Sequence, residues 1–183
     1  GTGGDQFSGT DIPGLPPTEH FWISKAVERM AQPIVRLFVP EVVEVHAPSA
    51  GAGGNLLFVS IRKEYPQQAR KVMNALWGLG PFATVKMMVV VDGDVDPRDE
   101  ERVWFLAGAN VHPGRDVVFC EGPTSQNDHA SPCVGVGHKM GLDATRKMAE
   151  EGHRRPWPDR LSMRSETAQL LANRWQAYGL PEE

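Results

Sequence analysis

Cysteine is scarce in this sequence, and its scarcity excludes two kinds of architecture. The 183 residues include two cysteines, Cys120 and Cys133, and six histidines. A disulfide framework needs several cysteine pairs, and zinc sites need close pairs with spacings such as CxxC or HExxH, none of which occurs here. We therefore expect reduced thiols, no metal site within this chain and a cytoplasmic location.

Long apolar runs and an excess of positive charge are missing too. No run approaches the roughly 20 apolar residues that span a bilayer, and the N-terminus lacks the basic and apolar regions of a signal peptide. The formal net charge of -4 gives no electrostatic footprint for nucleic acid or for an anionic membrane. We expect a protein that binds neither nucleic acid nor membranes.

Complete catalytic motifs are absent as well. No serine lies in a GxSxG nucleophile elbow, which a serine hydrolase of the common type requires. The run Gly135–Gly141 is rich in glycine, but it has neither the Walker A nor the dinucleotide-binding spacing. The residues by themselves therefore assign no catalytic group to this chain.

The length and the apolar fraction are those of one folded domain. A chain of 183 residues buries roughly 70% of the surface that its unfolded form exposes, so a sizeable core is possible without staples. Residues 1–17 contain five glycines and three prolines but few large apolar residues, which predicts a flexible or extended lead-in. We expect the folded domain to span residues 18–183.

Apolar runs typical of strands alternate with segments of helical periodicity. The predicted strands are residues 42–46, 56–62, 85–91 and 117–120. The predicted helices start near Thr18, at Pro66, after Asp99 and at Ser162. This alternation predicts an α/β fold, a layered sandwich of a mixed, largely parallel sheet flanked by helices. The last segment, 162–178, is expected to form an amphipathic C-terminal helix for docking or oligomer contact. Because proline lacks a backbone N–H, we expect Pro33 to break or kink the first helix.

A run of carboxylates, Asp92, Asp94 and Asp96, follows the most strand-like stretch. Carboxylates at the end of a buried strand are where α/β enzymes place metal and phosphate chemistry. The run resembles part of the haloacid-dehalogenase signature, but Asp96 stands where that family carries Thr or Val. As a calcium loop it has Pro97 in place of the turn glycine and Val103 in place of the bidentate Glu. We interpret these carboxylates as caps and turn formers.

The segment 128–147 is the least periodic part of the chain. Its glycines lie among polar residues that include His129, His138, Lys139 and Asp143. This composition predicts an irregular segment that is neither helix nor strand. Long irregular segments in compact domains usually serve a site or an interface, so we expect residues 128–147 to serve one of the two.

Eight short motifs together carry a resemblance to a known family. They are Gly14–Glu19, Phe38–Val43, Ile61–Tyr65, Gln68–Met73, Val91–Asp96, Pro113–Asp116, Asp128–Pro132 and Lys139–Thr145. In this order and spacing, and over nearly the whole chain, they resemble the C-terminal part of the UbiD family of reversible decarboxylases, which use prenylated FMN.

The resemblance implies that this chain is the C-terminal domain of a UbiD-type carboxy-lyase. In that family the full-length enzyme holds prenylated FMN and Mn²⁺, and the catalytic Glu, Arg and Glu/Asp set lies upstream of this chain. The implied partners are the N-terminal flavin-binding part, further copies in a homo-oligomer, and an aromatic or α,β-unsaturated carboxylic acid. This chain alone is then expected to be inactive and to bind neither cofactor. The alternative is a non-catalytic assembly module of the same fold.

The resemblance also implies two groups of site residues. Arg62, with Lys63 beside it, is expected to reach the cofactor phosphate, since a guanidinium suits bidentate phosphate contact. The substrate pocket is expected to be lined by His129, Ala130, Ser131 and Pro132. His129 stands where the family typically has an aromatic residue such as Phe. Its imidazole shifts the expected substrate towards hydroxylated or heteroaromatic acids.

Overall fold

The structure, a computed structural model, describes residues 19–51, 54–126, 128–158 and 163–178. The chain divides after His153 into a larger and a smaller compact unit. The predicted lead-in, residues 1–17, and the predicted cap Thr18 lie outside the described residues. No helix in the described ranges is long and apolar enough to cross a bilayer.

The larger unit alternates helices with strands. Its strands are β1 (Val42–His46), β2 (Leu56–Ile61), β3 (Met87–Asp92), β4 (Val117–Pro123) and β5 (Val136–Asp143). Its α-helices are α1 (Glu19–Phe38), α2 (Gln68–Gly78), α3 (Glu100–Asn110) and the single turn α4 (Pro113–Asp116). Short 3-10 turns cover Ser49–Gly51, Gly80–Phe82 and Ala149–Glu151. Asp99 caps α3 as predicted, because its side chain accepts a hydrogen bond from the backbone N–H of Arg102.

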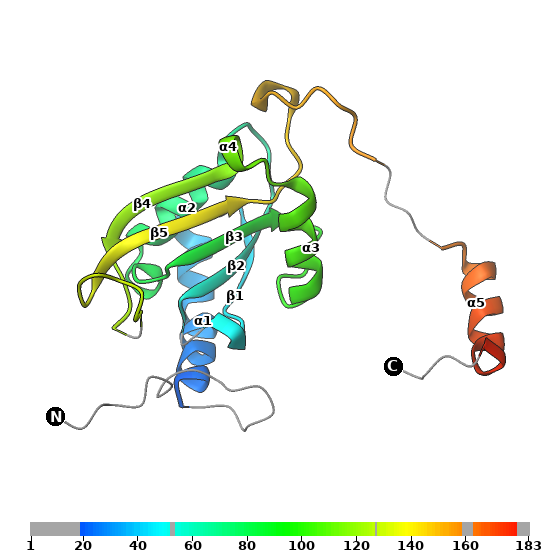
Figure 1. The fold of residues 1–183 in the computed structure, drawn as a ribbon, viewed down its shortest axis with the longest axis horizontal. Helices are drawn as coiled ribbons and strands as arrows, with labels where there is room; N and C mark the ends of the chain where they lie inside the picture. The colour runs from blue at the N-terminus through cyan, green and yellow to red at the C-terminus, as the bar shows by residue number, and fades with distance from the viewer. Residues whose placement is uncertain (1–18, 52–53, 127, 159–162, 179–183) are drawn as a thin grey trace. The chain divides into compact units, whose positions relative to one another are not determined.

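The strands form one sheet in the order β1-β2-β3-β5-β4 (Figure 1). The three central strands β2, β3 and β5 are parallel, and β1 and β4 are antiparallel edge strands. Parallel neighbours need crossover connections, which here contain α2 and α3. The predicted α/β fold with a mixed sheet, parallel at its centre and flanked by helices, is confirmed.

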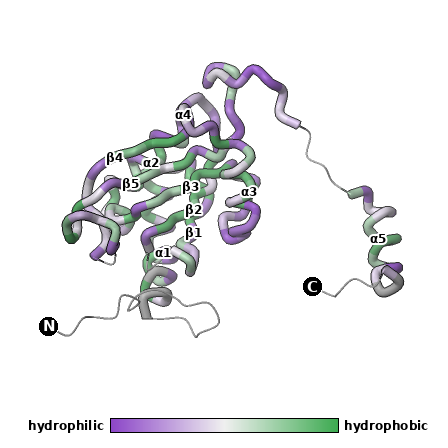
Figure 2. Tube along the Cα trace, in the orientation of Figure 1, coloured by the Kyte–Doolittle hydropathy of each residue, from purple (hydrophilic) through white to green (hydrophobic). Residues whose placement is uncertain are grey.

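Both faces of β2 and β3 are buried, which explains their continuous apolar sequences. One face packs against α1 and α2 and includes Leu57 and Val90. The other face, with Phe58 and Val89, packs against Val103 of α3. These two strands are correspondingly hydrophobic along most of their length in Figure 2.

Helix α1 continues through Pro33 to Phe38, so the expected break does not occur. Ala31 and Val35, on either side of the proline, are both buried against the sheet. Their packing holds the helix together across the missing hydrogen bond. Pro33 and Arg29 are both exposed, and because proline has no N–H, the carbonyl of Arg29 lacks its usual helical partner.

The prediction that residues 128–147 contain no strand is wrong for Val136–Asp143. These residues form β5, which is hydrogen-bonded to β3 on one side and β4 on the other. The buried positions of β5 are Gly137, Lys139, Gly141 and Asp143, whereas its more apolar residues alternate with them. When the buried face of a strand consists of glycines and charged residues, the sequence shows no recognisable hydrophobic alternation.

The burial of Lys139 in this strand has a local cause. Its ammonium donates a hydrogen bond to the carbonyl of Ala83 and lies 6.0 Å from the centre of the Trp77 ring. Burial lowers the pKa of Lys139. The lysine stem thereby fills space that an apolar side chain usually occupies.

The smaller unit contains α5 (Ser165–Arg174) and the 3-10 turn Trp175–Tyr178. The predicted C-terminal helix is therefore present, over a shorter range than 162–178. None of the described α5 side chains is buried, and Leu170 is 49% exposed.

Candidate functional site

The carboxyl ends of the three parallel strands meet at one edge of the sheet. Lys63 follows β2, Asp92 ends β3, and Asp143 ends β5. In open α/β sheets ligands bind outside this edge, so it is the first place to look for a site. The segment after β5 folds back here, since the side chain of Lys63 contacts Thr145 and Glu151.

A buried set of charges occupies this edge, which we call the carboxyl-edge network: Lys63, Asp116, Asp143, Lys147 and Glu151. The Nζ of Lys63 donates to Oε2 of Glu151 at 2.6 Å, and the Nζ of Lys147 lies 3.1 Å from Oδ1 of Asp143 and 3.8 Å from Oδ2 of Asp116. The two lysine side chains are 3% and 1% exposed. The network therefore ties the segment after β5 to the sheet through charges that water does not reach.

The charges in this network compensate one another. Burial raises the pKa of Asp116, but the hydrogen bonds from the Arg115 guanidinium and the His112 N–H, with the charge of Lys147, bring it below its ordinary value. Burial likewise raises the pKa of Glu151, and the hydrogen bonds from Lys63 and from the N–H groups of Gln67 and Met148, with the charge of Lys63, together more than offset this. Every ammonium faces a carboxylate or a carbonyl, so the network acts as a structural clamp.

The two residues predicted to bind phosphate have different surroundings. Arg62 is exposed, and one of its terminal nitrogens donates to the carbonyl of Pro40 at 2.9 Å. Lys63 is buried in the carboxyl-edge network, where its ammonium also donates to the hydroxyl of Thr145 at 3.0 Å. The guanidinium of Arg62 is thus exposed, whereas the ammonium of Lys63 is already engaged.

Of the carboxylates at the end of β3 and after it, Asp96 serves local structure, whereas Asp92 and Asp94 bind the distant Arg146. Asp96 accepts a hydrogen bond from the N–H of Arg98 at 2.9 Å, as expected for a turn former. Asp92 instead accepts from the backbone and the side chain of Arg146, at 2.9 and 3.1 Å. Burial raises the pKa of Asp92 in spite of these bonds. Asp94 completes the contact at 3.3 Å from Arg146.

The predicted substrate residues lie in the loop between β4 and β5, which is organised by Asp128. This carboxylate accepts from Nζ of Lys86 at 2.6 Å, from the hydroxyl of Ser131 at 2.5 Å and from the N–H of Ala130 at 3.2 Å. Burial raises the pKa of Asp128, but these bonds hold it below its ordinary value. His129 and Pro132 are exposed. Of the predicted residues, Ser131 is the one whose side chain is bonded within the loop.

Lys86 is a residue that the sequence did not bring to notice. It lies 42 positions before its partner Asp128, and no local pattern connects the two. Gly137, one of the glycines of the segment 128–147, is needed in the same loop. A Cβ at this position would come within 2.4 Å of Oγ of Ser131, so only glycine lets the loop close onto β5 without a shift.

The structure does not bring the two predicted groups together. The loop is anchored by Lys86, which lies immediately before the start of β3. Arg62 and Lys63 follow the end of β2, and this end lies beside Asp92 at the end of β3. The six residues of β3 separate its start from its end, which is about 20 Å at the usual rise per residue. The two groups are therefore separate sites on this chain.

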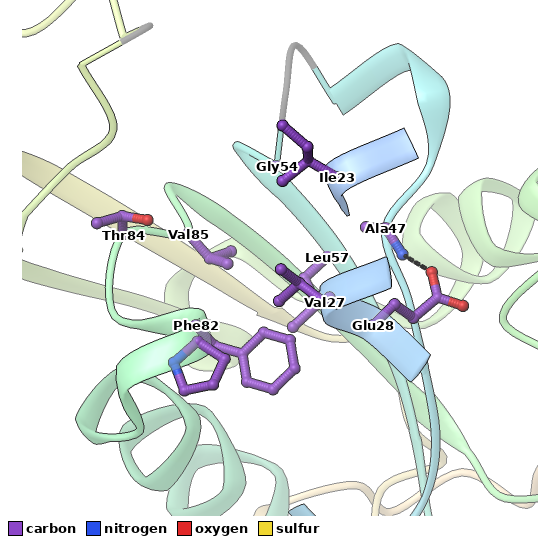
Figure 3. Close-up of a pocket in the computed structure, with 10 residues that line it drawn as sticks. Ile23, Val27, Glu28, Ala47, Gly54, Leu57, Phe82, Thr84 and Val85 are labelled. Carbon is purple, nitrogen blue, oxygen red and sulfur yellow. Dashed lines mark hydrogen bonds between the residues drawn. The ribbon is translucent and has the colours of Figure 1, made fainter. Parts of the chain in front are cut away.

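A third feature is a cavity of about 160 Å³ beside α1 (Figure 3). It is lined mostly by apolar side chains, among them Ile23, Val27, Leu57, Phe82 and Val85. None of the predicted site residues lines it. Among the residues that the structure describes, no group of three or more His, Cys, Asp or Glu side chains is arranged to hold a metal ion.

Comparison with known proteins identifies the family. The model of the 3-octaprenyl-4-hydroxybenzoate carboxy-lyase C-terminal domain matches residues 21–144. An uncharacterized protein of Archaeoglobus fulgidus is 42% identical over 165 residues, which is 90% of this chain and 34% of that protein. One of Aquifex aeolicus is 41% identical over 171 residues, 93% of this chain and 35% of that protein. The chain thus spans about a third of the length of these relatives.

Solved structures agree with this result. The UbiD-class enzyme HmfF from Pelotomaculum thermopropionicum, in complex with FMN, is 28% identical with a TM-score of 0.69 over 84% of this chain and 34% of that chain. The open form of vanillic acid decarboxylase from Sedimentibacter hydroxybenzoicus is 26% identical with a TM-score of 0.72 over 91% of this chain and 36% of that chain. The chain therefore belongs to the UbiD family, in which it corresponds to the C-terminal domain.

Proposed function

We propose that this chain is the C-terminal domain of a prenylated-FMN-dependent decarboxylase and that it closes the substrate pocket and supports assembly of the enzyme. The observation that carries the proposal is the family match over residues 21–144, in a fold shared with an FMN-bound UbiD-class enzyme. The reaction is the reversible, non-oxidative loss of carbon dioxide from an aromatic or α,β-unsaturated carboxylic acid. A closing role is supported by vanillic acid decarboxylase, which has been solved in open and closed forms.

The chain's own residues would contribute contacts rather than chemistry. When bound in the complete enzyme, the prenylated flavin supplies the electron sink for the electron pair that carbon dioxide leaves behind. Arg62 holds the cofactor phosphate with its exposed guanidinium. The substrate is met by the loop of His129, Ala130, Ser131 and Pro132, which the Asp128–Lys86 ion pair keeps in place. We assign the Mn²⁺ ligands and the catalytic acid to the flavin-binding part of the enzyme.

The proposal is tested by reconstitution. The chain is mixed with the flavin-binding part of a related enzyme, prenylated FMN and Mn²⁺, and carbon dioxide release is measured from a panel of aromatic and unsaturated acids. We expect release only when both protein parts are present, with a preference for hydroxylated acids because of His129. A stable complex that never releases carbon dioxide from any acid would favour the alternative, a non-catalytic assembly module.

The Arg62→Ala variant is expected to retain the flavin at least about 10-fold more weakly, because a charge-assisted hydrogen bond to phosphate contributes roughly 1.5–3 kcal/mol. Turnover per bound flavin should stay within about twofold of the wild type, since Arg62 contacts no reacting atom. Retention is measured from flavin absorbance after gel filtration of the reconstituted enzyme. Arg155→Ala, at another exposed arginine, is the control. Equal retention in both variants would refute the phosphate contact.

We also propose a cytoplasmic location. Cys120 and Cys133 are both free, which suits a reducing compartment.

A further inference from the structure

A second group of charges lies outside the carboxyl-edge network, where β1 ends between α1 and α3. His46, the last residue of β1, is buried there and is 7% exposed. Its Nδ1 faces Lys25 and Glu28 of α1, and its Nε2 faces Glu100 of α3. Strand β2 contributes an uncharged ring, Phe58, whose centre is 6.4 Å from that of the imidazole. One histidine therefore joins three elements of the fold.

The ammonium of Lys25 determines how the ring of His46 is bonded. Its Nζ lies 3.0 Å from Oε2 of Glu28, 2.8 Å from the carbonyl of Ala47 and 3.1 Å from Nδ1 of His46. An ammonium has three hydrogens to donate and accepts none. Nδ1 of His46 must therefore be the acceptor, which means that it carries no proton in this arrangement.

The other ring nitrogen of His46 then carries the proton. A neutral imidazole has one N–H, so when Nδ1 accepts a hydrogen bond, Nε2 is free to donate one. Its acceptor is Oε1 of Glu100, at 3.2 Å. The contacts of the ring thus assign it to the neutral Nε2–H form, in which it accepts from α1 and donates to α3.

A second arrangement of the same side chains follows when the ring gains a proton. Nδ1–H of His46 would then point at the ammonium of Lys25, and two donors cannot share a hydrogen bond. The Lys25 side chain is 23% exposed, so its ammonium can turn into water. Oε2 of Glu28, 3.6 Å from Nδ1, can take its place as the partner of the ring. The protonated ring would lie between two carboxylates, those of Glu28 and Glu100.

The remaining charges near His46 are compatible with both arrangements. Glu44, two residues earlier on β1, accepts from Arg98 with 2.6 Å between the charged atoms. Arg98 also lies 3.8 Å from Oε1 of Glu28 and 3.8 Å from Oδ1 of Asp96. Arg98 contacts Oε1 of Glu28, so Oε2 of that carboxylate is left to receive either the ammonium or the ring. The competition for Glu28 is therefore between Lys25 and His46.

We propose that His46 is a proton-operated switch between α1 and α3: the neutral ring holds Lys25 at the end of β1, and protonation releases Lys25 and bonds the ring to Glu28. Histidine is the side chain whose charge ordinarily changes between pH 5 and 8, so the attachment of α1 to β1 becomes dependent on pH in that range. The released contact lies beside the cavity, which Glu28 and Ala47 help to line (Figure 3). The proposal does not depend on the decarboxylation chemistry.

Nitrogen NMR of the imidazole rings tests the two arrangements in the 183-residue chain. At pH 8 we expect His46 to show an unprotonated Nδ1, a protonated Nε2 and a nuclear Overhauser contact between its Hε1 and the ε-methylene of Lys25. At pH 5 both nitrogens should be protonated and that contact should be lost. His138, which is exposed on β5, is the reference ring. A proton on Nδ1 at pH 8, a ring still neutral at pH 5, or a Lys25 contact that survives protonation would each overturn the proposal.

Two variants test which charges compete with the proton. Lys25→Met removes the cation that faces Nδ1, so the midpoint of the His46 titration should move up by about one pH unit, whereas Glu100→Gln removes a carboxylate and should move it down. Lys71→Met, whose ammonium contacts Glu41 instead, is the control and should leave the midpoint unchanged. Thermal unfolding checks that all three variants fold. An unchanged midpoint in Lys25→Met, or one that moves down, would contradict the proposed competition.

Discussion

Replacing Lys147 by methionine is expected to lower the free energy of unfolding by about 3–5 kcal/mol, the usual cost of removing one partner from a buried ion pair. The ammonium lies between two carboxylates, 3.1 Å from Asp143 and 3.8 Å from Asp116. It also donates to the carbonyls of Asp143 and Thr145 at 2.6 and 2.7 Å. Methionine fills a similar volume but leaves all four oxygens without this donor. The loss therefore comes from unpaired charge rather than from a cavity.

Urea denaturation at pH 7 measures this loss. Arg155→Met, which removes an exposed cation outside the carboxyl-edge network, should change the unfolding free energy by less than about 0.5 kcal/mol. A loss below about 1 kcal/mol for Lys147→Met would show that the network is solvated and does not clamp the segment after β5.

In the same variant, the part of the stability that depends on Asp116 should be less sensitive to acid. The pKa of Asp116 is lower in the folded protein than its ordinary 3.8, so its contribution to stability is complete above that value and is lost as the pH falls through the lowered pKa. Lys147 is one of the charges that lower it. Without Lys147 the folded pKa of Asp116 rises towards its ordinary value, so in urea denaturation the variant should lose less of its free energy of unfolding on acidification than the wild type does.

The parts of the fold that the sequence predicted are those with local signals. Strands β2 and β3 are buried on both faces, so their apolar runs are unbroken and easily recognised. The cap at Asp99 needs only its own side chain and the N–H three residues later. Each of these features depends on neighbours within one or two turns of the chain.

The features that the sequence could not predict depend on distant contacts. The buried face of β5 has a polar sequence, since it includes Lys139. This lysine can be buried because its ammonium contacts the carbonyl of Ala83 and the ring of Trp77, which lie far away in the sequence. Pro33 was expected to interrupt α1, but packing of the flanking turns outweighs the lost hydrogen bond. Interior packing of this kind leaves no pattern in the local sequence.

The site was predictable only in part for the same reason. The resemblance to the family drew attention to Arg62 and to residues 129–132, but the motifs do not say at which end of a strand each lies. That depends on the direction and register of β3 and β5, which the structure supplies. The Lys63–Glu151 pair joins residues 88 positions apart, and no local pattern predicts it.

Adding one methyl group at Gly141 is expected to lower the free energy of unfolding by about 1–3 kcal/mol, the usual cost of overpacking a core. A Cβ at this position would lie 2.4 Å from Sδ of Met73 and 3.3 Å from its Cγ and Cε. Met73 is fully buried in α2, so its flexible side chain has little room to move away. Glycine at this point of β5 therefore lets α2 approach the sheet closely.

A double-mutant cycle separates this contact from a general weakening of β5. Met73→Ala alone should cost about 2–5 kcal/mol through the cavity that it leaves. The double variant should cost less than the sum of the two single changes by at least about 1 kcal/mol, because the shortened side chain makes room for the added methyl. Gly108→Ala is the control, since a Cβ there meets nothing within 4 Å, and in helix α3 it should be neutral or slightly stabilising. Additivity within about 0.5 kcal/mol in urea denaturation would mean that Gly141 is required for the strand backbone itself and not for the approach of Met73.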